Sequence, residues 1–144
     1  MKDFSFGVVP VFKEGDKLLF LLIQHLHEKG GHWAFPKGHP EVGETEIESA
    51  KRELEEETGV KDVKIIEGLE FFEKYSFEQD GIHIDKTVKY FVGIANSKDV
   101  TKQEIEVGDY VWLEFEDALE KITFVEGKKM LKKVGENIDK INSL

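Results

Sequence analysis

One stretch of the chain, residues 38–60, constrains the fold more than any other (GHPEVGETEIESAKRELEEETGV). Three glutamates within it lie three and one residues apart: Glu53, Glu56 and Glu57. At about 100° of rotation per residue, these side chains share one side of a helix within an arc of about 100°. We therefore predict a helix with a row of carboxylates, which is a surface able to hold a divalent metal ion.

Signals for both ends of this helix are present in the sequence. Thr45 followed three residues later by Glu48 has the form of a capping box. Gly59 can adopt the left-handed conformation that ends many helices. We therefore expect a helix over residues 46–58. Apolar residues at the i, i+3, i+7 spacing would dock it on a core: Ile47, Ala50 and Leu54.

The acidic helix has a simple alternative interpretation, because a Glu-rich helix alone is most often a solvated face. Four glutamates crowd its second half, and Lys51 and Arg52 offset only part of their mutual repulsion. The loop before the helix, residues 38–44, contains two glycines and a proline that suit tight, irregular backbone. Loop, cap, terminal glycine and one-sided carboxylates together favour a metal-binding function.

The same stretch also carries a longer pattern of residue types at fixed spacing. The pattern is glycine, five residues, glutamate, seven residues, and then Arg-Glu-aliphatic-x-Glu-Glu-x-Gly-aliphatic. Nine positions match it without a departure: Gly38, Glu44, Arg52, Glu53, Leu54, Glu56, Glu57, Gly59 and Val60. The pattern resembles the signature of the Nudix hydrolases, and nine specified positions make chance agreement remote. The resemblance implies hydrolysis of a nucleoside diphosphate linked to another group, with Mg²⁺ or Mn²⁺ as cofactor.

Composition limits the classes of protein to which the chain can belong. At 144 residues we expect one domain, residues 1–144, and no apolar run approaches the length that crosses a bilayer. The net charge of −10 argues against sequence-independent binding of DNA or RNA, and it favours metal ions as mediators for a polyanionic substrate. The absence of cysteine excludes disulfides and is compatible with a cytoplasmic location.

Strands are predicted along most of the remaining chain. Alternating or apolar runs of strand length fall within residues 4–12, 17–25, 32–36, 61–75, 86–95 and 110–113. Pro10 in the first run demands a sheet edge or a bulge. The tripeptide Gln79-Asp80-Gly81 signals a hairpin turn, and residues 96–108 form a polar loop that could overhang a site.

Two further helical segments are expected near the end of the chain. Residues 116–120 form a helical turn, and the apolar period from residue 124 onward predicts a final amphipathic helix. This order of elements predicts an α/β fold in which helices cover both faces of a mixed sheet. The family resemblance implies the same architecture, because Nudix domains are α/β/α sandwiches with a mixed β-sheet.

The resemblance also implies a role for each signature residue. Glu56 and Glu57 would be the main metal ligands. Glu53 would bind metal directly or through water, and the backbone carbonyl of Gly38 would add a further ligand. Arg52 would orient carboxylates by charge-assisted hydrogen bonds without touching substrate. Hydrolysis of a phosphoanhydride needs neutralised phosphate oxygens and an activated water, which fits this metal-dependent arrangement.

Two roles stay open from the sequence. The general base is either Glu53 or a glutamate of the polar loop. In that loop Glu106 is preferred over Glu104, because its spacing to Tyr-x-Trp-Leu matches the animal diadenosine tetraphosphate hydrolases. Glu44 serves the metal site structurally or in its outer shell, or else it favours the positive N-terminus of the helix.

Segments outside the signature resemble the asymmetrically cleaving diadenosine tetraphosphate hydrolases. They cover residues 33–39, 86–90 and 110–113. In that subfamily lysines bind the polyphosphate and aromatic side chains stack on adenine. Lys37 and Lys86 are therefore phosphate candidates, Tyr90 is a stacking candidate, and His39 is a further substrate-binding candidate. Other aromatic residues on the strands are expected in the core: Trp33, Phe35 and Trp112.

Two other functions compete with cleavage of diadenosine tetraphosphate to ATP and AMP. The same chemistry could act on a nucleoside triphosphate, an RNA 5′ end or a nucleotide sugar, although the acidic charge disfavours a long RNA. A non-catalytic nucleotide-sensing domain is the other alternative, but such domains typically lose signature carboxylates. We expect a small-molecule nucleotide as partner, with neither DNA nor a membrane, and the sequence predicts no oligomeric state.

Overall fold

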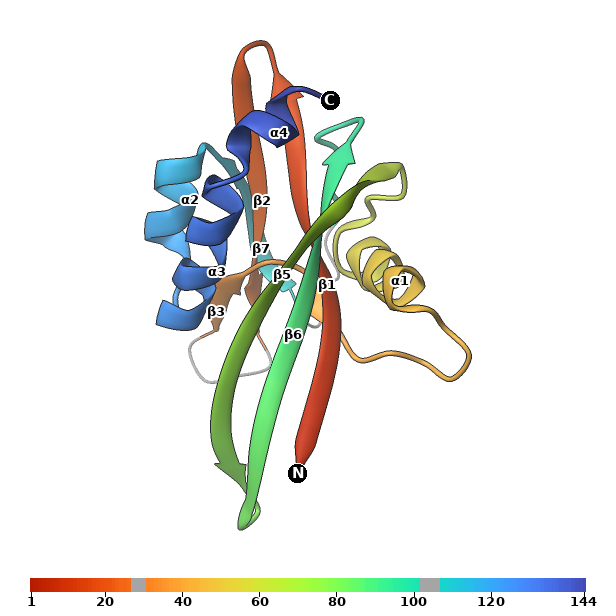
Figure 1. Cartoon of the computed structure of the whole chain (residues 1–144), viewed down its shortest axis with the longest axis vertical. Helices are drawn as coiled ribbons and strands as arrows, with labels where there is room; N and C mark the ends of the chain where they lie inside the picture. Colours follow the sequence, from red (N-terminus) through yellow and green to blue (C-terminus); the bar gives the residue numbers. More distant parts are fainter. Residues whose placement is uncertain (27–30, 102–106) are drawn as a thin grey trace.

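The computed structural model describes residues 1–26, 31–101 and 107–144 of the chain. The elements in chain order are β1 (Lys2–Glu14), β2 (Lys17–His25), β3 (His32–Ala34), β4 (Lys37–Gly38), α1 (Glu46–Thr58), β5 (Val63–Gln79), β6 (Ile82–Ala95), β7 (Val107–Leu113), α2 (Phe115–Lys121), α3 (Val125–Gly135) and α4 (Ile138–Asn142). The strands form a mixed sheet with α1 on one face and the C-terminal helices on the other (Figure 1). The predicted α/β/α arrangement is confirmed.

Strand β1 lies at the centre of the sheet and brings distant segments together. The main strand order is β3-β2-β1-β6-β5, with β4 paired to β1 and β7 paired to β2. The parallel pairing of β1 with β6 sets Asp3 opposite Lys86 and Gly7 opposite Tyr90. On the other side of β1, the short strand β4 sets Lys37 opposite Gly7. Three of the predicted substrate-binding residues therefore lie on neighbouring strands.

The structure corrects the prediction that Pro10 requires an edge strand or a bulge. Pro10 lies within β1, in a continuous register with β6. The N–H of Val8 donates to the carbonyl of Pro36, so by alternation the nitrogen of Pro10 points to the same side of the strand. On that side the pairing with β4 ends at Gly7 and the pairing with β2 begins at Val11. The missing N–H of proline therefore falls in a gap between two partners.

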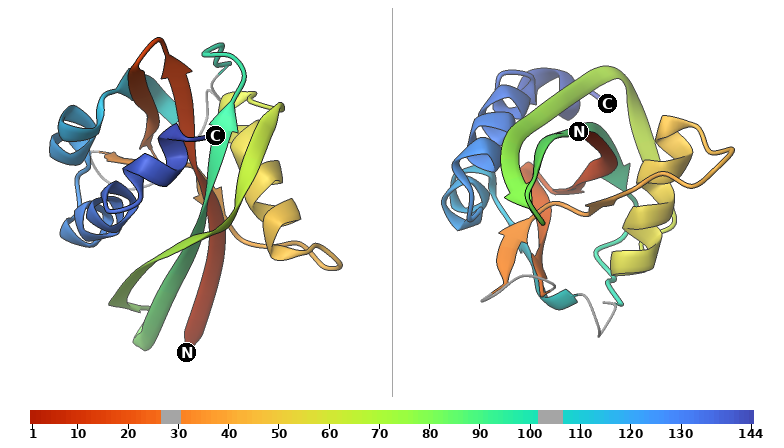
Figure 2. Two further views of the ribbon diagram at one scale, coloured as in Figure 1. Left: turned by 45° about the horizontal axis from the view of Figure 1, so that its top comes forward. Right: turned by 90° about the horizontal axis from the view of Figure 1, so that it is seen from below.

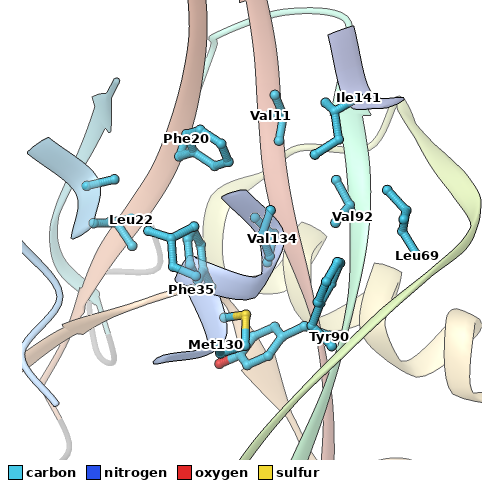
Figure 3. Close-up of a cluster of buried hydrophobic side chains, with 14 of the residues drawn as sticks. Val11, Phe20, Leu22, Phe35, Leu69, Tyr90, Val92, Met130, Val134 and Ile141 are labelled. Atoms are coloured by element: carbon cyan, nitrogen blue, oxygen red, sulfur yellow. The ribbon is translucent and has the colours of Figure 1, made fainter. Parts of the chain in front are cut away.

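Two hydrophobic clusters fix the helices on the sheet, because alternate residues of each strand face opposite sides. The larger cluster includes Val11, Phe20, Leu22, Val92, Met130, Val134 and Ile141 (Figure 3). The smaller cluster joins the other face to α1 and includes Val8, Leu21, Ala50, Leu54 and Phe91. Helix α1 is thus packed against the central strands.

The β5–β6 hairpin is longer than the predicted strands and forms an extended wall. Its turn is centred on Asp80 and Gly81, whose positive φ angles of 52° and 76° are those of a tight hairpin turn at the predicted place. A register shift between Ile65 and Glu70 bends β5, which then packs against α3 (Figure 2). The hairpin and the start of β1 extend together beyond the helices (Figure 1).

The predicted final amphipathic helix is divided into α3 and α4. Helix α3 ends at Gly135, where an added Cβ would lie 2.5 Å from the ring of Phe115. Glycine therefore permits the close approach of α3 to α2, and it also weakens the helix at that point. Among the described residues, no helix is long and apolar enough to cross a membrane.

Candidate active site

Helix α1 begins and ends at the predicted residues. The Thr45 hydroxyl accepts from the N–H of Glu48 at 3.2 Å, and the Glu48 carboxylate accepts from the N–H of Thr45 at 2.8 Å. At the other end Gly59 has a φ of 75° and its N–H donates to the carbonyl of Glu55 at 2.7 Å. Because both ends are fixed by local hydrogen bonds, the carboxylate row has a defined orientation.

The predicted docking stripe of α1 is only partly right. Ala50 and Leu54 are completely buried, but Ile47 is 40% exposed. The buried residues of α1 begin at Ser49, so the first turn of the helix does not dock on the sheet. The stripe continues instead to Glu57, which is buried although it is charged. One of the predicted metal ligands therefore lies on the docked side of the helix.

Buried Glu57 is held by two strands. Its Oε1 atom accepts from the backbone N–H of Lys37 at 3.0 Å. Its Oε2 atom lies 3.8 Å from Nδ1 of His25, whose Nε2 is 3.3 Å from the carbonyl of Phe35. These polar neighbours compensate part of the cost of burying a carboxylate. No role for His25 was predicted from the sequence, because its contact with Glu57 depends on tertiary packing.

Arg52 gathers the other carboxylates of the signature. Its Nε and Nη2 atoms bind both oxygens of Glu44 at 2.7 and 3.1 Å. Its Nη1 atom lies 2.8 Å from Glu53 Oε1 and 3.1 Å from Glu56 Oε1. Nη2 also donates to the carbonyl of His39 at 2.8 Å. The hydrogen bonds to Glu44 and its neighbours raise the pKa of Arg52, so the guanidinium is a permanent charge that orients carboxylates.

Glu44 joins the loop to the helix. Besides its two bonds from Arg52, it accepts from the N–H of Glu41 at 2.7 Å and from the hydroxyl of Ser49 at 2.8 Å. The hydrogen bonds from Arg52 lower the pKa of Glu44 to about 2. Its contacts are therefore those of a structural clamp on Arg52, while the helix N-terminus is capped by the Thr45 pair.

Gly38 and Glu53 are in direct contact. A Cβ atom added to Gly38 would lie 2.1 Å from the carboxyl carbon of Glu53, which is far inside ordinary contact distance. The carboxylate of Glu53 therefore rests on the backbone of β4, where a side chain would displace it. Two residues predicted to supply metal ligands, Gly38 and Glu53, therefore lie in close approach.

The donor set around α1 suits a hard divalent cation. Glu53, Glu56, Glu57 and the Gly38 carbonyl offer only oxygen atoms, which Mg²⁺ and Mn²⁺ prefer. Within the described ranges, however, no three His, Asp or Glu side chains form a completed metal-ligand group. Arg52 holds Glu53 and Glu56 in ion pairs instead. The residues fit the ion chemically, and metal binding stays a prediction.

A cleft of about 580 Å³ lies beside the signature. It meets the signature at His39 and at Lys37, the residue directly before the signature; both line the cleft, while their backbone atoms bind Arg52 and Glu57 respectively. Its basic lining residues include two lysines, Lys37 and Lys86, and the histidine His39. Its aromatic lining residues are Tyr75, Phe77 and Phe124. The cleft therefore combines groups suited to phosphate with groups suited to a base.

Lys86 lies in the wall of this cleft within a polar network. Its Nζ atom donates to Asp3 at 2.9 Å and to the hydroxyl of Ser5, and it lies 3.3 Å from His39 Nε2. Burial lowers the pKa of Lys86, an effect that Asp3 opposes. Burial raises the pKa of Asp3, but hydrogen bonds from Lys86 and His39 outweigh it and lower that pKa. Asp3 was missed from the sequence, because only the parallel register places it there.

The prediction that Tyr90 stacks on a base is wrong. It is 1% exposed, and its ring packs edge-on against Phe35 with centroids 6.1 Å apart. Lys86 and Tyr90 share one face of β6, but at Tyr90 this face is covered by Met130 and its neighbours in the core (Figure 3). A base cannot reach its ring. Phe35 is also in the core as expected, and Trp33 and Trp112 are partly buried against the two clusters.

The aromatic residues that do line the cleft were missed, although a signal for one was present. The turn at Asp80-Gly81 sets the register of the hairpin, and counting back from it places Tyr75 opposite Lys86. The two remaining base candidates, Glu104 and Glu106, lie outside the described residues. Their roles and the catalytic roles of Glu53 and Arg52 stay predictions.

Comparison with known proteins identifies the class to which this fold and site belong. The family model described as the NUDIX domain matches residues 1–134. The chain therefore belongs to the Nudix family, and we describe it as a Nudix hydrolase.

Individual relatives show which members of the family this chain is similar to. The asymmetrical bis(5′-nucleosyl)-tetraphosphatase of Caenorhabditis elegans is 32% identical over 127 residues, which cover 88% of this chain and 90% of that protein. A crystal structure of a C. elegans Ap4A hydrolase binary complex superimposes with a TM-score of 0.79 at 31% identity, covering 95% of this chain and 98% of the other. MutT4 of Mycobacterium tuberculosis is 29% identical over 111 residues, and the match spans 77% of this chain but only 44% of that protein. Bacterial RNA pyrophosphohydrolases are also similar.

Proposed function

We propose that the chain hydrolyses diadenosine tetraphosphate asymmetrically, releasing ATP and AMP, with Mg²⁺ or Mn²⁺ as cofactor. One observation carries the proposal. A single cleft joins three aromatic side chains, two lysines and His39 to the backbone that holds the signature carboxylates. This combination of aromatic and basic groups suits a ligand that consists of a base and a chain of phosphates.

The signature end of the site would perform the chemistry. Glu53, Glu56, Glu57 and the carbonyl of Gly38 would hold the cation, which when bound neutralises phosphate oxygens and lowers the pKa of a water. Arg52 keeps two of these carboxylates oriented. Glu53 or a glutamate of the polar loop, Glu106 in preference to Glu104, would accept the proton of the attacking water as general base.

The middle of the cleft would bind the polyphosphate. Lys37 and Lys86 approach the cleft from opposite sides of β1, with His39 beside Lys86. Asp3 is hydrogen-bonded to Lys86 and His39, so a phosphate would have to compete with this carboxylate for both side chains. Lysine is a suitable point charge for phosphate, and the chain's net charge of −10 makes such local cations necessary.

The aromatic part of the cleft would bind adenine. Tyr75 and Phe77 project from one face of β5, and Phe124 precedes α3 on the other side. Stacking of a base on an aromatic side chain contributes about 1–3 kcal/mol and tolerates different bases. Affinity for a second nucleoside would favour a dinucleotide over a simple triphosphate.

Product analysis in ¹⁸O-labelled water tests the proposal directly. The protein is incubated with Mg²⁺ and, separately, diadenosine tetraphosphate, ATP, ADP-ribose and an RNA with a 5′-triphosphate end. We expect ATP and AMP from the dinucleotide, with the label in only one product, at a kcat/KM at least tenfold above that of the other substrates. Glu56→Gln should abolish release, whereas Glu67→Gln, an exposed residue of β5, serves as the matched control. Preferential release of pyrophosphate from RNA would replace this substrate assignment.

A further inference from the structure

Glu73 lies in the wall of the cleft and has no part in the function proposed above. It is on β5, it lines the cleft, and it is only 7% exposed. Among residues 1–26, 31–101 and 107–144, no group donates a hydrogen bond to its carboxylate or forms an ion pair with it. With no partner among these residues, this deeply set carboxylate depends on water or a ligand in the cleft to compensate the cost of its burial.

The surroundings of Glu73 close it off on one side. A Cβ atom added to Gly127 in the first turn of α3 would lie 2.9 Å from Glu73 Oε2, so the carboxylate packs directly against this helix. Burial raises the pKa of Glu73; the Lys37 ammonium opposes this effect, and the Glu126 carboxylate adds to it. On the side away from α3 the carboxylate borders the cleft, from which a ligand can supply a hydrogen-bond donor.

The position of Glu73 on β5 indicates which part of a ligand it meets. Side chains two residues apart on a strand share a face, so Glu73 and Tyr75 are neighbours about 7 Å apart along the wall. Ionised phosphates carry no proton to donate and would repel a carboxylate. The donors of a nucleotide belong to its nucleoside, which offers an amine on the base and hydroxyls on the ribose. The neighbouring aromatic residue is also a group suited to a base.

We propose that Glu73 is a specificity-determining residue that accepts a hydrogen bond from an amine or hydroxyl donor of the bound nucleoside. This inference rests on the proposed function, because it takes a nucleotide as the occupant of the cleft. A fixed acceptor discriminates strongly, since a ligand that lacks the donor leaves the carboxylate buried and unpaired. Ligands with a carbonyl at the same place are repelled.

Calorimetric binding of AMP measures this contact without turnover, because AMP has no phosphoanhydride. The proteins are the wild type, Glu73→Leu, Glu73→Gln and the control Glu67→Leu, which makes the same change at an exposed position of β5. We expect Glu73→Leu to weaken AMP binding about tenfold to a hundredfold, the range of a hydrogen bond to a charged group. Glu73→Gln keeps a carbonyl acceptor and should recover part of the loss, while Glu67→Leu should bind as the wild type does.

Three further ligands identify the donor. IMP lacks the base amine, and 2′-deoxy-AMP and 3′-deoxy-AMP each lack one ribose hydroxyl. The penalty of Glu73→Leu should disappear for the one ligand that lacks the donor. Equal penalties for all four ligands, or unchanged AMP affinity in a folded Glu73→Leu protein, overturn the proposal. If Glu73→Leu does not fold, the same four ligands are compared on Glu73→Gln, where a donor-specific change is again required.

The binding experiments on Glu73 and the test of the proposed hydrolysis can fail independently of each other. Wild-type protein that binds AMP with this donor dependence, but releases nothing from diadenosine tetraphosphate, refutes the hydrolytic function and supports the role of Glu73. If the protein releases ATP and AMP but Glu73→Leu changes the binding of no ligand, the hydrolytic function is supported and the role of Glu73 is refuted.

Discussion

Gly38→Ala is the substitution for which the structure gives the clearest magnitude. The new Cβ atom would lie 2.1 Å from the carboxyl carbon of Glu53, whereas ordinary contact begins at 3.4 Å. The carboxylate must therefore retreat by about 1.3 Å, the difference between these distances. This shift breaks or stretches its 2.8 Å bond to Arg52 Nη1. Since a misplacement of about 1 Å can cost about 10²-fold in rate, we expect kcat to fall about a hundredfold.

The assay is the initial rate of ATP and AMP release from diadenosine tetraphosphate at saturating Mg²⁺, with thermal unfolding measured in parallel. Gly43→Ala is a matched control from the same loop. Gly43 has a φ of 89° and nothing within 4 Å of an added Cβ, so alanine there strains the backbone but leaves Glu53 in place. We expect Gly43→Ala to lower stability by about 1 kcal/mol with little change in kcat.

A double-variant comparison connects the loss to Glu53. If Gly38→Ala acts through this carboxylate, adding it to Glu53→Gln should lower kcat much less than it does in the wild type. A folded Gly38→Ala protein with kcat within threefold of the wild type would refute the reasoning. Full additivity of the two substitutions would place the effect of Gly38 elsewhere.

Three further outcomes are expected. Glu44 has a folded pKa of about 2 against an ordinary value of 4.5, so its contribution to stability is present above pH 4.5 and is lost as the pH falls toward 2; urea unfolding of Glu44→Gln should show a smaller acid dependence in this window. Glu73 has a raised pKa, so its ionised form destabilises the fold as the pH rises above 4.5, and Glu73→Gln should raise Tm at pH 7 but not at pH 4 in calorimetry. Tyr75→Ala should raise KM about tenfold, because a stacking contact with the base is lost. Tyr90→Ala should lower the free energy of unfolding by about 3–5 kcal/mol in urea titrations, because it empties a core position. The opposite pattern would reverse the two assignments.

Local signals explain how much of the site the sequence could predict. The bounds of α1 are correct because the Thr45 box and Gly59 act within a few residues of the helix ends. The carboxylate row follows from helical geometry, and the Arg52 contacts involve residues close in sequence. The docking stripe failed at Ile47, because the place where a helix leaves its sheet depends on the partner strands and not on the helix.

Long-range pairing explains what the sequence could not supply. Asp3 reaches Lys86 through a parallel register between residues 83 positions apart, and no local pattern encodes that register. His25 reaches Glu57 only after β2 and α1 have packed. Tyr90 was misassigned because the alternation of β6 gives its face but not the point at which α3 begins to cover that face.

The Asp80-Gly81 turn has a consequence for how the cleft can change. Its two positive φ angles fix the register of β5 against β6, and thereby the inward face on which Glu73, Tyr75 and Phe77 stand. Deleting or inserting one residue there would turn that whole row outward, because strand faces alternate with a period of two. On the proposed function, side-chain exchanges along β5 would therefore change the nucleotide preference of the cleft, whereas changes in hairpin length would remove these side chains from it.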